Sequence, residues 1–113
     1  MNDVTMATLH TALRGLAQRQ RVISDNIANI ETPSFIAGRV DFEDSLRGAL
    51  ESGNPQLAEA TASQSTAPTN VNGNNVQLDT ETVASLDTGL RYQLTLEAMN
   101  AKFRLLRASL AAR

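Results

Sequence analysis

The segment Met6–Ile30, MATLHTALRGLAQRQRVISDNIANI, decides the fold of this 113-residue chain. Its apolar residues recur at alternating spacings of three and four, which are the a and d positions of a heptad repeat. One polar residue, Gln20, interrupts the stripe; it is either incidental or fixes the register of helix packing. The pattern predicts a long helix that packs lengthwise on other helices. Its expected packing residues are Leu9, Leu13, Leu16, Ile23, Ile27 and Ile30.

The boundaries of this first helix follow from residues on either side of the stripe. We expect it to run from about Thr5 to Ile30, with Asp3 or Thr5 as the cap, because short oxygen-bearing side chains accept hydrogen bonds from free N–H groups. Thr32-Pro33 ends it, since a residue before proline is disfavoured in the α region. Gly15 is either tolerated, at a cost of up to ~1 kcal/mol relative to Ala, or allows close approach of another helix.

A second helix is expected at the other end of the chain, from Asp79 or Thr80 to about Ala112, with Asp79 as its N-cap. Its second half carries two stripes, one from Tyr92 to Leu110 and an alanine-rich one from Leu94 to Ala112. The stripes are offset by two residues, or about 200° around a helix, so they lie on nearly opposite faces. One face fits the first helix, and the other needs a different partner. The expected packing residues are Leu86, Leu90, Tyr92, Leu96, Met99, Phe103, Leu105, Leu106 and Leu110.

The middle of the chain is less regular. Asp41 is expected to cap a short helix from Phe42 to about Leu50. The segment 51–75 is rich in Ser, Thr, Asn, Gln, Gly and Pro, which predicts a mobile loop. The expected fold is therefore all-α: two long terminal helices in a coiled-coil-like hairpin, a short helix and a flexible polar loop. The expected parts are residues 1–33, 34–50, 51–78 and 79–113.

Composition excludes several classes of function. The chain has no cysteine, one histidine, a net charge of −2 and a pI near 5.3. We therefore expect no catalytic residue, no metal, no cofactor and no nucleic-acid partner, with His10 solvated or interfacial. No run approaches the ~20 apolar residues that span a bilayer. The first residues lack a basic region followed by an apolar run, so we expect no cleaved Sec-type signal peptide.

Two segments resemble a known family. Residues 19–35, RQRVISDNIANIETPSF, resemble the N-terminal signature of the flagellar axial proteins, which include rod, hook and hook-associated proteins. Residues 72–81, NGNNVQLDTE, and the later AMNAKF at 98–103 are similar to the short proximal rod members of that family. Ser34 stands where the family usually has glycine, a change that bears on the turn after the first helix. The matching motif residues are Asn26, Asn29, Thr32, Pro33, Gly73, Asn74, Asn75 and Leu78.

The resemblance implies a structural subunit of the bacterial flagellar basal-body rod and not an enzyme. Such subunits self-assemble through their terminal helices into the drive shaft that transmits torque across the periplasm. The implied partners are other rod proteins and further copies of itself, the adaptor between the inner-membrane ring and the rod base, and the flagellar type III export apparatus. Direct membrane insertion is not expected. The stripes alone also fit an alternative, a helical adaptor or chaperone-like protein that binds a partner helix.

Overall fold

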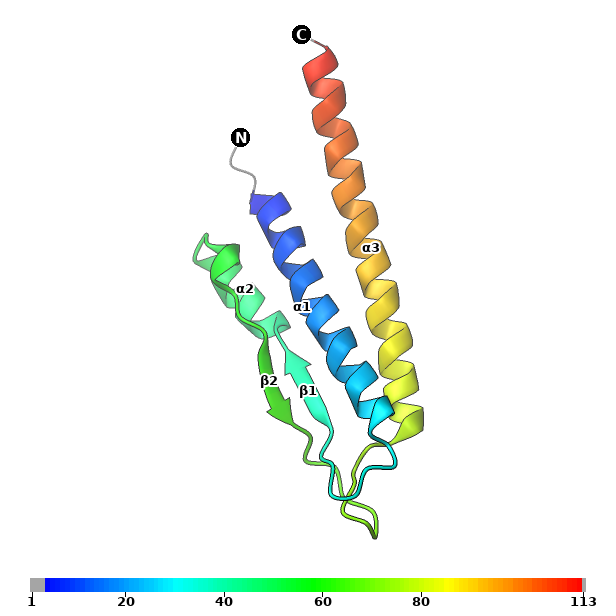
Figure 1. The fold of residues 1–113 in the computed structure, drawn as a ribbon. Helices are drawn as coiled ribbons and strands as arrows, with labels where there is room; N and C mark the ends of the chain where they lie inside the picture. Colours follow the sequence, from blue (N-terminus) through cyan, green and yellow to red (C-terminus); the bar gives the residue numbers. More distant parts are fainter. Residues whose placement is uncertain (1–3, 113) are drawn as a thin grey trace.

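The computed structural model describes residues 4–112. The long helices α1 and α3 lie side by side and run in opposite directions, and α2 and the two strands lie on the other side of α1 (Figure 1). The Cα atoms span 66 × 26 × 14 Å, so the molecule is long and flat. In chain order the elements are α1 (Val4–Ala28), β1 (Gly38–Asp41), α2 (Glu43–Glu51), the 3-10 helix η1 (Pro55–Leu57), β2 (Thr61–Gln64) and α3 (Leu78–Ala111).

The end of α1 lies two residues before the predicted Ile30. Beyond Ala28 the chain continues in tighter turns, in which the Ile30 N–H donates to the carbonyl of Ile27 and the Thr32 N–H donates to that of Asn29. These turns satisfy carbonyl groups that the end of a helix leaves free. At the other end of α1, Asp3, one of the two expected caps, lies outside the described residues, and Thr5, the other, lies inside the helix.

The two other predicted caps are wrong. The N-cap of α2 is Phe42 and that of α3 is Gln77, and neither makes a side-chain capping hydrogen bond. Asp41 is instead the last residue of β1, where its backbone pairs with Thr61. Asp79 lies inside the first turn of α3, where a carboxylate still stabilises the positive end of the helix dipole.

A two-stranded antiparallel sheet makes the fold not strictly all-α. Gly38 pairs with Gln64 and Val40 with Ala62, and the Ser65 N–H extends the ladder to the Ala37 carbonyl at 2.8 Å. The segment expected to be a polar loop thus contains both η1 and β2. Every residue of β2 is exposed, so hydrophobic burial does not hold this strand in place.

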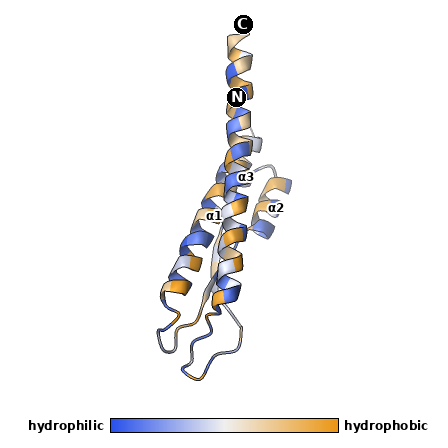
Figure 2. Cartoon of the chain, turned by 90° about the vertical axis from the view of Figure 1, so that its right-hand side faces the viewer, coloured by the Kyte–Doolittle hydropathy of each residue, from blue (hydrophilic) through white to orange (hydrophobic). Residues whose placement is uncertain are grey.

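The hydrophobic core is small and lies mostly on the side of α1 that faces α2 and the sheet. In α3 the only buried residue among those described is Thr88, so half-buried side chains make up most of the contact of α3 with α1. Its coiled-coil character stays a prediction. Figure 2 views α3 from the side away from α1, and hydrophobic residues recur along that side. The buried apolar residues are Leu16, Ile23, Ala37, Val40, Phe42, Ala58 and Val76.

Candidate functional site

Asn26, in the last turn of α1, joins the helix to the strand that follows it. Its side chain is only 1% exposed. The Oδ1 atom accepts a hydrogen bond from the Gly38 N–H at 2.8 Å, and Nδ2 donates to the Gly38 carbonyl at 3.0 Å. The same Nδ2 donates to the Glu81 carboxylate of α3 at 3.2 Å. One amide therefore connects α1, β1 and α3.

Asn74 performs the same task for the loop before α3. It is 1% exposed, and its Nδ2 donates to the carbonyl oxygens of Asn29 at 2.9 Å and Thr32 at 2.8 Å. Its Oδ1 accepts from the Val76 N–H at 2.7 Å. The Asn29 and Thr32 carbonyls belong to the turns beyond α1, so Asn74 links these turns to the loop that precedes α3.

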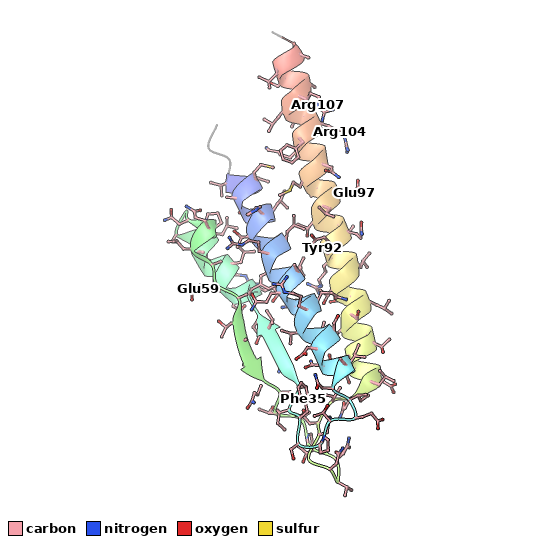
Figure 3. The ribbon with its side chains drawn as sticks, in the orientation of Figure 1. Phe35, Glu59, Tyr92, Glu97, Arg104 and Arg107 are labelled. Carbon is pink, nitrogen blue, oxygen red and sulfur yellow. The ribbon has the colours of Figure 1, made fainter. Side chains whose placement is uncertain are left out.

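Asn75, the next residue, hydrogen-bonds to backbone groups of the segments that flank the two strands. Its Oδ1 accepts from the Ala37 N–H at 2.7 Å, and its Nδ2 donates to the Ala67 carbonyl at 3.1 Å. Its own N–H donates to the Phe35 carbonyl at 3.2 Å (Phe35 is labelled in Figure 3). We refer to the three buried side chains Asn26, Asn74 and Asn75 as the asparagine cluster. Together they satisfy backbone groups that the sheet and helices leave unpaired.

Ser34 shows how the departure from the family's usual glycine is accommodated. It has φ of 62°, the left-handed region that normally favours glycine. Its N–H donates to the Asn72 carbonyl at 2.9 Å. Gly73, with φ of 82°, lies against it: a Cβ on Gly73 would stand 3.2 Å from the Ser34 Cα. The serine therefore keeps a glycine-type turn, and the two motif segments pack directly on each other.

The remaining motif residues are more exposed. Asn29 is half-buried and donates to the Asp25 carbonyl at 2.8 Å, while the Thr32 hydroxyl donates to Asn29 Oδ1 at 3.0 Å. Pro33 is exposed in the turn. Leu78 opens α3 and is 51% exposed. Asn29 and Thr32 therefore hydrogen-bond within the turn, whereas Pro33 and Leu78 are exposed.

A second polar site, which the sequence did not indicate, fixes α2 to α1. The Arg19 guanidinium makes a bidentate ion pair with Glu43, at 2.7 and 2.6 Å, and also donates to the Val40 carbonyl. It lies 4.9 Å from the ring centroid of Phe42. The hydrogen bond from Arg19 lowers the pKa of Glu43 from 4.5 to about 2. Arg19 and Glu43 are 24 residues apart, so no local sequence signal connects them.

The seam between α1 and α3 contains the polar residue that interrupts the first stripe. Gln20 Nε2 donates to the Ser85 hydroxyl at 2.8 Å, which fixes the register of α1 against α3 at this point. Its Oε1 is buried and has no partner within residues 4–112. Beside it is a groove of about 490 Å³ whose walls include Ala17, Gly89 and Tyr92.

The predicted packing residues fall into three groups by exposure. Leu16 and Ile23 are buried. The half-buried members are Leu9, Leu13, Ile27, Ile30, Tyr92, Leu96, Met99 and Leu106. The exposed members are Leu86, Leu90, Phe103, Leu105 and Leu110.

One face of α3 is apolar and uncovered within the described part of the chain. We define the outer face of α3 as five large side chains that are 60–71% exposed and lie away from α1. They are Val83, Leu86, Leu90, Leu94 and Leu105. A row of exposed large apolar residues makes this face a candidate surface for contact with another protein.

Other kinds of site find little support in the described residues. No group of three His, Asp or Glu within residues 4–112 could hold a metal ion, and His10 is exposed on α1. Over the same range, none of the helices combines the length and the apolar character needed to cross a bilayer.

Comparison with known proteins assigns the chain to a class. Residues 6–35, which contain nearly all of α1 and the turn after it, match the family model described as "Flagella basal body rod protein".

Three relatives narrow the class, each named flagellar basal body rod protein FlgB. The one from Bacillus subtilis (strain 168) is 31% identical, and the alignment covers 94% of this chain and 92% of the relative. The Escherichia coli (strain K12) protein is 27% identical over 90% and 89%. The Borreliella burgdorferi protein is 30% identical over 83% and 87%. The chain belongs to the FlgB family of flagellar basal body rod proteins.

Proposed function

We propose that this chain is a structural, non-enzymatic subunit of the proximal flagellar rod, which self-assembles through its terminal helices into the shaft that transmits torque. The observation that supports this most directly is the outer face of α3. Its leucines are 60–71% exposed although they lie at helical spacing on one side of a 34-residue helix. Burying such side chains stabilises by roughly 1.5–3 kcal/mol each. Contact with neighbouring subunits would provide that burial.

The asparagine cluster supports the same proposal from within the subunit. It fixes the end of α1 and the start of α3 at one end of the molecule through hydrogen bonds of 2.7–3.2 Å. Load applied to either helix therefore passes to the other. The motif residues Asn29, Thr32, Pro33 and Leu78, which are more exposed, are proposed to contact neighbouring subunits.

The proposed partners are those of a rod-base subunit. They are further copies of this chain, other rod proteins, and the adaptor between the inner-membrane ring and the rod. Export would use the flagellar type III apparatus without a cleaved signal, with the assembled protein in the periplasm-spanning rod.

Substitutions on the outer face test the proposal. Leu90 and Leu105 are 60% and 63% exposed, so Leu90→Glu and Leu105→Glu should leave the melting temperature of the isolated protein nearly unchanged. In cells they should abolish rod recovery and swimming while export continues, because a carboxylate buried without a partner costs several kcal/mol. Thr82→Glu, at another exposed position of α3, is the matched control.

Two results would count against the proposal. One is normal swimming in the Leu105→Glu strain, which would mean that the outer face stays in solvent. The other is a gene-deletion strain that still builds rods beyond the inner-membrane ring, which would favour the adaptor or chaperone-like alternative.

A further inference from the structure

The loop before α3 contains Asn72-Gly73, the one place in the chain where an asparagine precedes a glycine. Asparagine is chemically labile because the backbone nitrogen of the next residue can attack its side-chain amide carbon. Glycine hinders this attack least, since it has no side chain. The loop lies at the end of the molecule away from the last turn of α3 (Figure 1), and Asn72 is exposed to water. The residue types and the solvent access needed for deamidation therefore coincide at Asn72.

Three hydrogen bonds hold this turn closed in the folded chain. The Gly73 N–H donates to the Asn70 carbonyl at 2.9 Å. The Asn72 Oδ1 accepts from the Asn74 N–H at 3.1 Å, and the Asn72 carbonyl accepts from the Ser34 N–H at 2.9 Å. The first bond shields the proton that Gly73 must lose before its nitrogen attacks. The second holds the side-chain carbonyl of Asn72 toward Asn74.

The asparagine cluster opposes opening of this turn. Asn74 and Asn75 follow Gly73 directly and are 1% and 4% exposed. Their side chains bond to backbone groups of residues 29, 32 and 37, which lie on a distant part of the chain. Exposing the Gly73 N–H to base therefore requires a local opening of the structure, and such openings limit the reactivity of backbone amides.

We propose that Asn72 is a deamidation site that the folded turn keeps inactive. When the turn opens, the Gly73 nitrogen attacks Asn72 Cγ and a new C–N bond forms. The side-chain amide nitrogen leaves as ammonia, which carries away the proton from Gly73. Water then opens the cyclic imide at either carbonyl. The products are aspartate, or isoaspartate, in which the main chain runs through the side chain of residue 72.

The two products should differ in their effect on the turn. Aspartate keeps the backbone, and its carboxylate still accepts from the Asn74 N–H. Isoaspartate adds one bond to the main chain between residues 72 and 73, which lengthens it by about 1.5 Å. A Cβ on Gly73 would already stand 3.2 Å from the Ser34 Cα, so little room exists for this shift. Isoaspartate should therefore disrupt the contact between the two motif segments.

Incubating the full chain at mildly alkaline pH, with and without urea, tests the protection. Peptide mass spectrometry follows the replacement of an amide by a carboxyl group at Asn72 and at Asn100, an exposed residue of α3 that precedes alanine. In urea, where circular dichroism confirms unfolding, Asn72 should convert faster than Asn100. In the folded protein Asn72 should convert at least about tenfold more slowly than in urea, because the hydrogen bonds of the turn must break first. Gly73→Ala should slow the conversion in urea, since its methyl group hinders the attack.

The refolded product tests the consequence. Protein converted in urea is refolded, and its isoaspartate form is separated from the aspartate form. The isoaspartate form should have a lower melting temperature than wild-type protein that was freshly unfolded and refolded. Asn72→Asp is the matched control, because it adds the charge without the extra bond, and it should melt near the wild type.

Three results would contradict a protected site at Asn72. They are equal conversion of Asn72 with and without urea, conversion of Asn100 as fast as Asn72 in urea, and an isoaspartate form that melts like the wild type. All three would leave the proposed function intact, because that function depends on the outer face of α3.

Discussion

Gly15 of α1 lies directly against the ring of Phe42. A Cβ built on Gly15 would stand 2.6 Å from Cγ of that ring, closer than real Cβ atoms approach another atom. Phe42 is 5% exposed, and Arg19 covers it from one side. The glycine in the middle of α1 therefore does allow a close approach, by the aromatic ring of the residue that caps α2.

Gly15→Ala is expected to destabilise the protein despite the better helix propensity of alanine. The gain from propensity is up to ~1 kcal/mol, whereas overpacking a core site costs about 1–3 kcal/mol. Urea titration should show a net loss in the free energy of unfolding. Gly48→Ala in α2 is the control, because a Cβ there meets nothing within 4 Å, and it should stabilise. A more stable Gly15→Ala protein would contradict the packing of Phe42.

Asn74→Asp tests the asparagine cluster without changing size. The substitution replaces a donor by a carboxylate oxygen that faces the carbonyls of Asn29 and Thr32, at the 2.9 and 2.8 Å separations of the present bonds. Each unsatisfied buried group costs about 1–3 kcal/mol, so a loss of several kcal/mol is expected on thermal or urea unfolding. Asn70→Asp, at an exposed position of the same loop, should change little. Equal effects of the two would show that the cluster does not hold the loop.

Gly73→Ala and Gly53→Ala form a matched pair. Both glycines have positive φ, of 82° and 83°, so alanine strains the backbone at each by roughly 1–2 kcal/mol. Only at Gly73 does the added Cβ also meet another segment, 3.2 Å from the Ser34 Cα. The loss of unfolding free energy should therefore be larger for Gly73→Ala. Similar losses would mean that the two motif segments are not in close contact.

The pKa of Glu43 gives a pH test of the link between α1 and α2. Its folded-state pKa is lowered from 4.5 to about 2, so the carboxylate contributes stability above pH 4.5, and that contribution is lost as pH falls toward 2. Glu43→Gln should lower the melting temperature at neutral pH and flatten its decline between these pH values. Glu97→Gln, an exposed carboxylate of α3, serves as control. Parallel pH profiles for Glu43→Gln and the wild type would exclude the ion pair with Arg19.

The long helices were predictable because their evidence is periodic and local. The spacing of Leu9, Leu13 and Leu16 shows an amphipathic helix regardless of what it packs against. The strand pair was not predictable in this way. Residues 61–64, Thr-Ala-Ser-Gln, show no hydrophobic alternation and are all exposed. Their place depends on Gly38–Asp41 and on Asn75, which are distant in sequence.

The site was predictable as a motif but not as a structure. Composition marks Asn72-Gly73-Asn74 as a turn, and the family resemblance marks the same residues as important. Neither says that Asn74 and Asn75 are buried, because polar residues in a loop are usually exposed. Besides partners within ten residues, they bond to backbone groups 38 to 45 residues away, which sequence spacing does not show.

The flat shape of the subunit has a mechanical consequence. With Cα extents of 66 × 26 × 14 Å, a single copy resists stretching along α3, whose 34 residues form one unbroken ladder of hydrogen bonds, but it flexes most easily across its thinnest dimension. A thin subunit of this kind bends easily alone and becomes stiff when neighbouring subunits prevent it from bending. In the proposed rod, resistance to twisting would come from subunits packed against one another and could not be measured on one copy.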